Sequence, residues 1–486
     1  MKRTKIVATI GPASESPKTM AKMFKAGLDV ARLNFSHNVH RHHLMLMKNL
    51  RATAKKQGKN IAILQDLQGP RIRIGDVGEK GVSVKTGEEV VLFYSNQPVT
   101  KKTKPVLIPI HYQNLYRDLK KGDLILIDDA LIRLEVKEIK NKEIFCRVLA
   151  GGKIKTRKGM NFPKSAIKAS PLTEKDLADL AFGIKNKVDF VALSFVKDAR
   201  DIINLRKKIM ALERKFGRLP RREKSPQTKI IAKIERREAV KNFDSILKTV
   251  DGIMVARGDL GIELPFEDVP LIQKEIIKKC NLAAKPVIVA TQMLDSMIRN
   301  PLPTRAEVSD VANAILDGTD AIMLSGESAT GLYPLAAVEA MTKIAKEVEP
   351  TEFKLQQELE KKLKRIKSMA DFAAFNAQDL AEKMKAKAII CFTKSGYTAR
   401  MIIRYKSRVP LFVFTPSEAV KNQLNLSWGV EAHQAAIGAS YPEALKTIFN
   451  FLKKNKKAKA GDTIIVCAGR RLPFFKGNNF IKVEAI

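Results

Sequence analysis

Lys229-Ile-Ile-Ala-Lys-Ile-Glu235 is an apolar segment with two charged side chains near its end. It predicts a buried strand, and because strand side chains alternate between faces, Lys233 and Glu235 should point the same way, roughly 6–7 Å apart. A buried ammonium or carboxylate is costly unless it is paired or holds an ion, so this strand end is a candidate functional site. The later segment Asp251-Gly-Ile-Met-Val-Ala-Arg-Gly-Asp259 repeats the arrangement. Two carboxylates and a lysine suggest a hard cation beside a phosphoryl group.

Apolar segments of this kind recur along the chain, and most are followed by a helix-like stretch. There are eight, at residues 5–11, 30–36, 61–66, 190–195, 229–235, 252–259, 286–292 and 321–327. Continuous apolar runs that alternate with helical patterns are typical of a parallel sheet, and eight of them match an α/β fold with a closed (β/α)8 TIM barrel. Six of the eight end in a polar or charged residue. In such barrels the strand ends carry the chemistry, so these residues should converge on one pocket.

The spacing of the segments predicts two further units. Between residues 66 and 190 the pattern changes to short alternating strands with glycine turns, which predicts a small β-barrel lid domain inserted after the third strand, at residues 69–168. The catalytic barrel then comprises residues 1–68 and 169–350. A charged amphipathic stretch at residues 349–367 leads out of the barrel, and residues 351–486 read as a C-terminal doubly wound α/β domain.

One turn in this last domain is a candidate ligand loop. Thr393-Lys-Ser-Gly-Tyr-Thr398 follows a predicted strand and precedes a predicted helix. Backbone N–H groups and hydroxyls in such a turn could hold a phosphate, with Thr393, Ser395, Gly396 and Thr398 as the binding residues. A plain strand-to-helix cap explains the same residues equally well.

Composition narrows the class of protein. No apolar run in the 486 residues reaches the length of about 18–20 needed to span a membrane. The apolar run near the start of the chain is too short for a signal peptide, so we expect a cytoplasmic protein.

Four widely separated cysteines without a CxxC pair favour reduced thiols. The net charge of +37 could serve nucleic acid, an anionic membrane surface or anionic substrates. Aromatic residues are few and are not interleaved with the basic runs, so no specific nucleic-acid binding is expected.

Six motifs in order carry a resemblance to a known family. They are Thr4-Lys-Ile-Val-Ala-Thr-Ile-Gly-Pro12, Ala31-Arg-Leu-Asn-Phe-Ser-His37, Ala232-Lys-Ile-Glu235, residues 251–265, Ala290-Thr-Gln-Met-Leu-Asp-Ser-Met297 and Met323-Leu-Ser-Gly-Glu327. Together they closely resemble the pyruvate kinases, over essentially the whole chain. The resemblance implies a barrel with an inserted lid and a regulatory C-terminal domain, usually as a homotetramer. It implies phosphoryl transfer from phosphoenolpyruvate to ADP, giving pyruvate and ATP in glycolysis, with a sugar phosphate or nucleotide as a candidate effector.

The resemblance also implies roles for single residues. Glu235 and Asp259 match the ligands of Mg²⁺ (or Mn²⁺), although a salt-bridged pair with Lys233 would explain a buried Glu235 as well. The implied catalytic residues are Lys233 and Arg32 at the phosphoryl group, Thr291 near the enolate, and Ser325, which is linked less directly to proton delivery. The implied substrate-binding residues are Arg32, Lys233, Arg257, Gly258, Asp259 and Thr291, with backbone N–H groups of residues 257–259 receiving a carboxylate at a helix start. The implied nucleotide-binding residues are Arg73, Lys158, Asn34 and His37.

The segment after the third strand departs from the family pattern. Potassium-requiring members carry Asp-Thr-Lys-Gly-Pro-Glu-Ile-Arg-Thr, whereas this chain has Asp66-Leu-Gln-Gly-Pro-Arg-Ile-Arg-Ile74. Arg71 replaces the glutamate, and its guanidinium can supply the positive charge of the bound ion. Leu67, Gln68 and Ile74 also differ as they do in potassium-independent members. We therefore expect that Arg71 replaces K⁺ at a monovalent-cation site formed by Asn34, Ser36, Asp66 and Leu67, and that K⁺ is not required.

Other departures concern the lid and the C-terminal domain. Ala130 stands where the family usually has glycine, Tyr397 where many members have arginine, and residues 469–475 differ from the family's effector loop.

Two rival functions stay open. One is another phosphoenolpyruvate/pyruvate barrel enzyme, a lyase or mutase, which would lack the inserted lid. The other is a basic nucleic-acid-binding protein on a kinase scaffold, in which catalytic positions should have been lost.

Overall fold

The computed structural model describes residues 2–98, 103–163, 165, 167–168, 170–220, 223, 225, 227–360, 368–436, 440–468 and 480–486, with side chains except in 352–360. The predicted stretch at 361–367 and the loop at 469–475 lie outside these residues. None of the helices in this part of the chain combines the length and the apolar character that a bilayer crossing requires.

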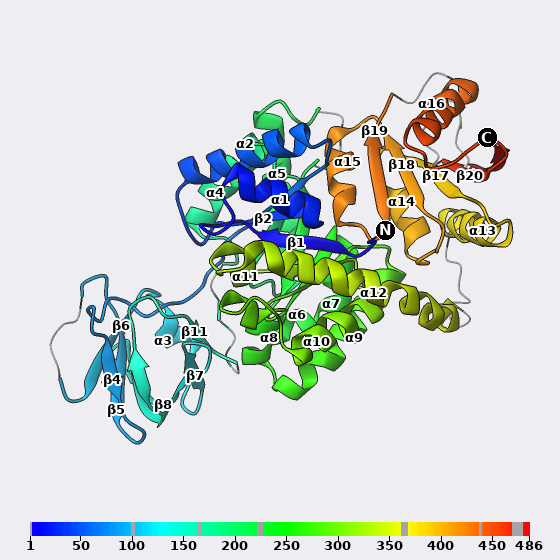
Figure 1. The fold of residues 1–486 in the computed structure, drawn as a ribbon. Helices are drawn as coiled ribbons and strands as arrows, with labels where there is room; N and C mark the ends of the chain where they lie inside the picture. Colours follow the sequence, from blue (N-terminus) through cyan, green and yellow to red (C-terminus); the bar gives the residue numbers. More distant parts are fainter. Residues whose placement is uncertain are drawn as a thin grey trace.

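A closed barrel of eight parallel strands forms the centre of the molecule, as the eight apolar segments predict (Figure 1). Each predicted segment contains one strand. The strands are β1 (Lys5–Thr9), β2 (Val30–Asn34), β3 (Ala62–Asp66), β12 (Phe190–Leu193), β13 (Lys229–Ile234), β14 (Gly252–Ala256), β15 (Val287–Ala290) and β16 (Ala321–Leu324). β1 pairs with both β2 and β16, which closes the ring.

Alternate residues of each barrel strand belong to two different cores. Ile6 and Ile63 pack into the large cluster shared with the surrounding helices, whereas Val7 and Leu64 belong to a separate cluster inside the barrel. This division follows from the period of two in a strand. Both faces of the strands are buried, which explains why the strands are mainly apolar on both faces.

Helices surround the barrel, and several begin at side-chain caps. The Ser16 side chain accepts from the Thr19 N–H, with Pro17 next in sequence, and reciprocal capping boxes join Thr173 to Asp176 and Thr304 to Glu307. The helices are α1 (Pro17–Ala26), α2 (His40–Lys56), α4 (Glu174–Lys185), α5 (Ala199–Lys215), α6 (Arg237–Lys241), α7 (Phe243–Thr249), α8 (Arg257–Glu263), α9 (Val269–Leu282), α10 (Arg305–Leu316), α11 (Gly326–Ala329) and α12 (Pro334–Glu360). Two short 3-10 helices, η1 (Phe266–Asp268) and η2 (Asp295–Ile298), lie among them.

The strands between β3 and β12 form a separate β unit that projects from the barrel (Figure 1). A six-stranded sheet, in the order β11-β7-β8-β9-β5-β6, and a two-stranded sheet of β10 and β4 enclose their own apolar core. The elements are β4 (Val82–Val84), β5 (Glu89–Tyr94), β6 (Val106–Ile110), α3 (Leu115–Asp118), β7 (Leu124–Ile127), β8 (Ile132–Lys140), β9 (Glu143–Ala150), β10 (Gly152–Ile154) and β11 (Met160–Asn161). Ala130, in the β7–β8 turn, has a φ of 68°, a conformation that glycine adopts more easily.

The C-terminal unit is a five-stranded sheet with helices on both faces, as predicted for a doubly wound domain. Its strands are β17 (Ala388–Phe392), β18 (Leu411–Thr415), β19 (Val430–Gln434), β20 (Thr463–Ala468) and β21 (Phe480–Ala485), and its helices are α13 (Met369–Lys383), α14 (Tyr397–Ile403), α15 (Glu418–Gln423), η3 (Leu424–Leu426) and α16 (Tyr441–Lys454). β19 was not predicted, because its Val-Glu-Ala-His-Gln sequence is short and half polar. It forms by pairing with β18 at the sheet edge.

Candidate active site

The polar ends of the barrel strands meet in one pocket, as the sequence predicts. Its lining residues come from seven of the eight strands or from the segments that follow them: Arg32, Asn34, Ser36, Asp66, Leu67, Gln68, Arg71, Ser194, Phe195, Lys233, Glu235, Met254, Ala256, Asp259, Thr291 and Met323. The carboxyl ends of parallel strands share one edge of the barrel, which is why residues so far apart in sequence become neighbours.

Lys233 lies at the centre of the charged groups in this pocket. Its Nζ lies 2.7 Å from Oε1 of Glu235 and 3.5 Å from Oδ1 of Asp66, and it donates a 2.8 Å hydrogen bond to Oγ of Ser194. Burial alone lowers the pKa of Lys233, but Asp66 and Glu235 outweigh that effect and the net pKa lies above the ordinary value. Lys233 is therefore a buried, permanently charged ammonium.

Asp66 pairs with two of the cations in the pocket, Arg32 and Lys233. Its Oδ2 accepts a 2.7 Å hydrogen bond from Nε of Arg32, and Nη1 of Arg32 donates to Oγ1 of Thr9 at 2.9 Å. Burial raises the pKa of Asp66, yet Lys233 and Arg32 more than offset it and hold the pKa below its usual range. The ionised carboxylate orients Arg32 and Lys233 toward the same space.

Glu235 and Asp259 fit a divalent cation. Burial is the main cause that raises the pKa of Glu235; Lys233 opposes the rise and the charge of Asp259 adds to it. Oε1 of Glu235 and Oδ1 of Asp66 are buried, and no hydrogen bond of good geometry satisfies either atom. No set of three or more His, Cys, Asp or Glu side chains suited to a metal occurs among the described residues. Two carboxylates without a complete protein cage suit Mg²⁺, which keeps waters and substrate oxygens as ligands.

Arg71 lies beside the acidic side of the pocket. Its Nη2 is 3.9 Å from Oδ1 of Asp259 and 3.8 Å from Oδ1 of Asp129 in the lid. Four other lining residues, Asn34, Ser36, Asp66 and Leu67, are those that the sequence assigned to a monovalent-cation site. A fixed positive charge is thus present in the same pocket as these residues.

Helix α8 begins at the strand end of β14, and Thr291 contacts its first turn. The Gly258 N–H donates to Oγ1 of Thr291 at 2.8 Å, while Nη2 of Arg257 donates to the Thr291 carbonyl at 2.9 Å and Nη1 of Arg257 pairs with Asp310. Thr291 has a φ of 71°, which is strained for a β-branched residue. Such strain is found at functional sites that the surrounding structure holds in place.

Several predicted residues do not line this pocket. Ser325 begins α11, and its N–H donates to Oε2 of Glu327 at 2.7 Å. Lys158 forms a 2.7 Å ion pair with Asp128 within the lid. His37 lies near three arginines, and its pKa is lowered first by burial and then by Arg73, Arg32 and Arg71. His37 and Arg73 therefore lie next to the pocket.

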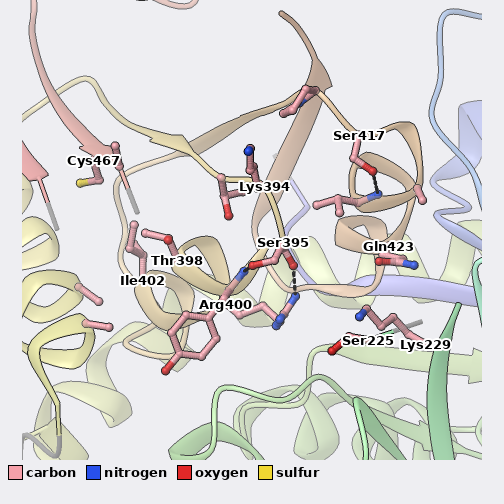
Figure 2. A pocket seen from close by; sticks show the side chains of 18 of the residues that line it. Ser225, Lys229, Lys394, Ser395, Thr398, Arg400, Ile402, Ser417, Gln423 and Cys467 are labelled. Atoms are coloured by element: carbon pink, nitrogen blue, oxygen red, sulfur yellow. Dashed lines mark hydrogen bonds between the residues drawn. The ribbon is translucent and has the colours of Figure 1, made fainter. Parts of the chain in front are cut away.

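Three of the four candidate effector residues line a second, larger cavity of about 1120 Å³ between the C-terminal unit and the barrel. Thr393, Ser395 and Thr398 lie on its C-terminal side, and the Gly396 N–H donates to Oγ1 of Thr393 at 3.0 Å. Figure 2 shows Lys394, Ser395, Thr398 and Arg400 opposite Lys229 and Ser225 of the barrel. Gly396 has a φ of 76° at the start of α14 and caps it without a side chain.

Sequence reasoning missed three contributors to the charged network. Ser194 accepts from Lys233, Thr9 accepts from Arg32, and the Phe195 N–H donates to Oε2 of Glu235 at 2.7 Å. Ser194 and Phe195 end the fourth apolar segment, so their position at a strand end was a usable signal. Asp66 was assigned only to the monovalent-cation site, because its partners lie on other strands.

Comparison with known proteins supports one family. The model of the pyruvate kinase barrel domain matches residues 1–338, and that of the pyruvate kinase alpha/beta domain matches residues 371–484. The chain is 41% identical to a pyruvate kinase of Clostridium perfringens over the whole length of both proteins. It is 42% identical to a pyruvate kinase of Geobacillus stearothermophilus, over all of this chain and 80% of the relative. A solved pyruvate kinase structure from Cryptosporidium parvum is 34% identical, with a TM-score of 0.92 over 100% of this chain and 96% of that one. The chain therefore belongs to the pyruvate kinase family.

Proposed function

We propose that the pocket at the strand ends is where this pyruvate kinase, a phosphotransferase, passes the phosphoryl group of phosphoenolpyruvate to ADP. The observation that carries the proposal is the buried Lys233 ammonium, held by Asp66, Glu235 and Ser194 and accompanied by Arg32. Phosphoryl transfer has a loose transition state, so catalysis depends on positioning and on charge stabilisation. Two fixed cations in a largely buried pocket supply both.

Arg32 and Lys233 bind the phosphoryl oxygens in this proposal, and the first turn of α8 binds the substrate carboxylate. The N–H groups of Arg257, Gly258 and Asp259 lie at the positive end of that helix. Because the Gly258 N–H donates to Oγ1 of Thr291, carboxylate binding requires the Thr291 hydroxyl to give up or share this contact. The Thr291 hydroxyl itself donates to the Ala290 carbonyl, so it must also leave that contact before its proton can reach the enolate.

The transfer breaks the bond between phosphorus and the enol oxygen and forms a bond to the terminal phosphate of ADP. The enolate that remains takes a proton at its methylene carbon to give pyruvate. Thr291 lines the pocket. Ser325 precedes α11, and its N–H donates to Glu327 in the first turn of that helix. We assign the proton-delivery path to Thr291 first and to Ser325 at its outer end.

Glu235 and Asp259 would hold Mg²⁺ or Mn²⁺. When bound, such a cation supplies positive charge to the phosphate oxygens and orients them for an in-line transfer. The raised pKa of Glu235, caused mainly by burial and increased by Asp259, supports a cation at this position. The ion pair between Lys233 and Glu235 is the salt-bridged alternative of the sequence reasoning.

ADP would bind between the barrel and the lid, contacted by Asn34, His37, Arg73 and Lys158. The lowered pKa of His37, due first to burial and then to Arg73 and two other arginines, supports a neutral imidazole in a cationic environment suited to phosphates. Lys158 must leave Asp128 to reach a nucleotide, so its part in binding depends on lid movement.

Activity without K⁺ follows from Arg71 in this proposal. Support comes from its distance of 3.9 Å to Asp259 and from the four monovalent-site residues in the same pocket. A guanidinium is always charged, so no monovalent ion is needed to complete the site.

Regulation and assembly extend the proposal. A sugar phosphate or a nucleotide would bind through Thr393, Ser395, Gly396 and Thr398, which is compatible with the large cavity at this loop. A homotetramer would cover exposed apolar side chains on the barrel surface, namely those of Phe266, Leu271, Leu302 and Leu332. We expect a cytoplasmic enzyme.

The three units proposed from the sequence are residues 1–68 with 169–350, residues 69–168, and residues 351–486. In support, β3 ends at Asp66, the strands β4 to β11 follow it, and the barrel resumes with α4 and β12. Helix α12 continues past position 350 to Glu360, so it crosses the proposed boundary between the barrel and the C-terminal unit.

Release of pyruvate from phosphoenolpyruvate tests the function directly. We expect pyruvate and ATP in equal amounts, in the presence of Mg²⁺, and no release when ADP is omitted. Pyruvate release without ADP would instead favour a lyase or mutase. Tight binding of duplex DNA at physiological salt, with no turnover, would favour a nucleic-acid-binding protein on this scaffold.

A further inference from the structure

A residue of the C-terminal unit fills the end of the barrel interior that lies opposite the catalytic pocket. Leu426, at the end of η3, is fully buried and belongs to the same apolar cluster as residues of the barrel strands. Leu424, two residues earlier, packs instead into the core of the C-terminal unit. The short η3 helix thus has one leucine in each of two hydrophobic cores.

Hydrogen bonds on both sides of Leu426 show which end of the barrel it enters. Nε2 of Gln423 donates to the carbonyls of Gln227 at 2.7 Å and Asp189 at 3.3 Å, just before β13 and β12. The Trp428 N–H donates to Asp320, just before β16. These residues precede their strands, so Leu426 enters opposite the catalytic end.

The barrel strands leave space for this side chain. Bulky branched residues dominate the interior of most (β/α)8 barrels. Here the inner cluster contains four alanines, and two of them, Ala62 and Ala321, are the first residues of β3 and β16, at the end of the barrel that Leu426 enters. Leu426 supplies apolar volume that the strands themselves do not provide.

The same inner cluster reaches the floor of the catalytic pocket. Met254 and Met323 belong to the cluster that contains Leu426, and both also line the pocket with Lys233 and Asp66. Lys233 follows Ile231, another member of this cluster, by two positions on β13 and therefore points to the same side of the strand. Close-packed interiors transmit a local change in volume to their neighbours.

We propose that Leu426 is a positioning residue for phosphoryl transfer. Leu426 belongs to the C-terminal unit and fills the base of the barrel. Through the inner cluster it holds Met254 and Met323 in place, and with them the face of β13 that carries Lys233. The inference rests on the proposed function of the pocket. It makes the C-terminal unit part of the structure on which the chemistry depends.

Steady-state kinetics of the full chain test the proposal, with assays well below the unfolding temperature of every variant. For Leu426→Ala we expect kcat to fall by about tenfold or more, because small misplacements of catalytic groups are costly. We expect the KM for phosphoenolpyruvate to change little, since the binding groups remain. Leu426→Met, similar in volume, should restore kcat to near the wild-type value.

Leu452→Ala is the matched control. Leu452 lies in α16 and is equally buried. It belongs to the core on the other face of the C-terminal sheet from Leu424. It should lower the unfolding temperature in a similar way and leave kcat unchanged. A wild-type kcat for folded Leu426→Ala, or an equal fall of kcat in Leu452→Ala, would overturn the proposal.

Two further results keep the outcomes distinct. If Leu426→Ala does not fold, Leu426→Val takes its place, and its kcat must fall below that of Leu426→Met. An unchanged kcat in Leu426→Val overturns the inference. If the wild-type protein shows no ADP-dependent pyruvate release, the proposed function itself fails. Wild-type turnover with an unchanged Leu426 series contradicts the positioning role alone.

Discussion

Nζ of Lys233 lies 2.7 Å from Oε1 of Glu235, so the proposed phosphoryl-binding cation and a proposed metal ligand form an ion pair with each other. A divalent cation must take Glu235 from Lys233, and a phosphoryl oxygen can then replace Glu235 as the partner of Lys233. Binding of the cation and of the substrate should therefore favour each other.

Removing the charge of Glu235 should weaken metal binding. In Glu235→Gln we expect the affinity for Mn²⁺ to fall by more than about tenfold, which corresponds to about 1.4 kcal/mol. Electron paramagnetic resonance of free Mn²⁺ measures this without any turnover. Glu443→Gln, at an exposed helix start remote from the pocket, serves as the control and should bind Mn²⁺ as the wild type does. Equal affinities in both variants would remove Glu235 from the metal site.

Metal binding should also depend on pH through Glu235. Burial, aided by Asp259, raises the pKa of this carboxyl above its ordinary value. As the pH falls through the raised pKa, the group becomes neutral and loses its value as a ligand, so Mn²⁺ affinity should decrease. Titrations at several pH values should show this slope in the wild type and a flatter one in Glu235→Gln. Identical slopes would mean that another group is responsible.

Replacement of Lys233 should affect the chemical step. In Lys233→Met we expect kcat to fall by roughly 10²–10³-fold, as for other groups that stabilise charge in a transition state. The KM for ADP should change little, because no contact to the nucleotide is assigned to Lys233. The exposed Lys241 on α6 provides a matched Lys→Met control with unchanged kcat. A kcat loss below about threefold would contradict the assigned role.

Charge reversal at Arg71 tests the replacement of K⁺. Wild-type activity in a tetraalkylammonium buffer should not rise when K⁺ is added, whereas Arg71→Glu should become strongly K⁺-dependent. The physical reason is that the variant loses the fixed cation near Asp259 and gains a carboxylate that can hold an ion. Arg147→Glu, on the exposed face of β9 in the lid, should remain K⁺-independent. Strong K⁺ dependence of the wild type would end this hypothesis.

Asp189, at the base of the barrel, should contribute a pH-dependent part of stability. Burial raises its pKa to about 7, while its Oδ2 accepts a 2.8 Å hydrogen bond from the Ile63 N–H. A raised folded-state pKa stabilises the fold at low pH. This contribution is lost as the pH rises from the ordinary carboxyl value, near 3.8, through about 7.

Asp189→Asn should remove that loss, because the amide is neutral at every pH and its oxygen can still accept from Ile63. We expect the unfolding temperature of the variant, relative to the wild type, to increase between pH 5 and pH 8, which spans most of this window. Differential scanning calorimetry measures the difference. A constant difference across this range would show that Asp189 does not titrate there.

Much of the fold was predictable from local sequence. The eight apolar segments each contain a barrel strand, and the changed pattern after Asp66 marks the inserted β unit, since hydrophobic periodicity is a property of neighbouring residues. The pocket was predictable for a related reason. Polar residues at the ends of parallel strands must meet when the barrel closes, so Arg32, Lys233, Glu235 and Asp259 could be grouped before their contacts were known.

Other features depend on the three-dimensional arrangement. Asp66 orients both Arg32 and Lys233, and Gly258 donates to Thr291, through contacts between residues that are 33 to 167 positions apart. Strand β19 has a weak pattern of its own and is stabilised by its pairing with β18. The strands, their order and the polar groups at their ends can be read from residues that are neighbours in the chain, because they follow from short-range periodicity. The pairing of the charges, and the packing of Leu426 from another unit into the barrel interior, depend on distances in space that no local pattern contains.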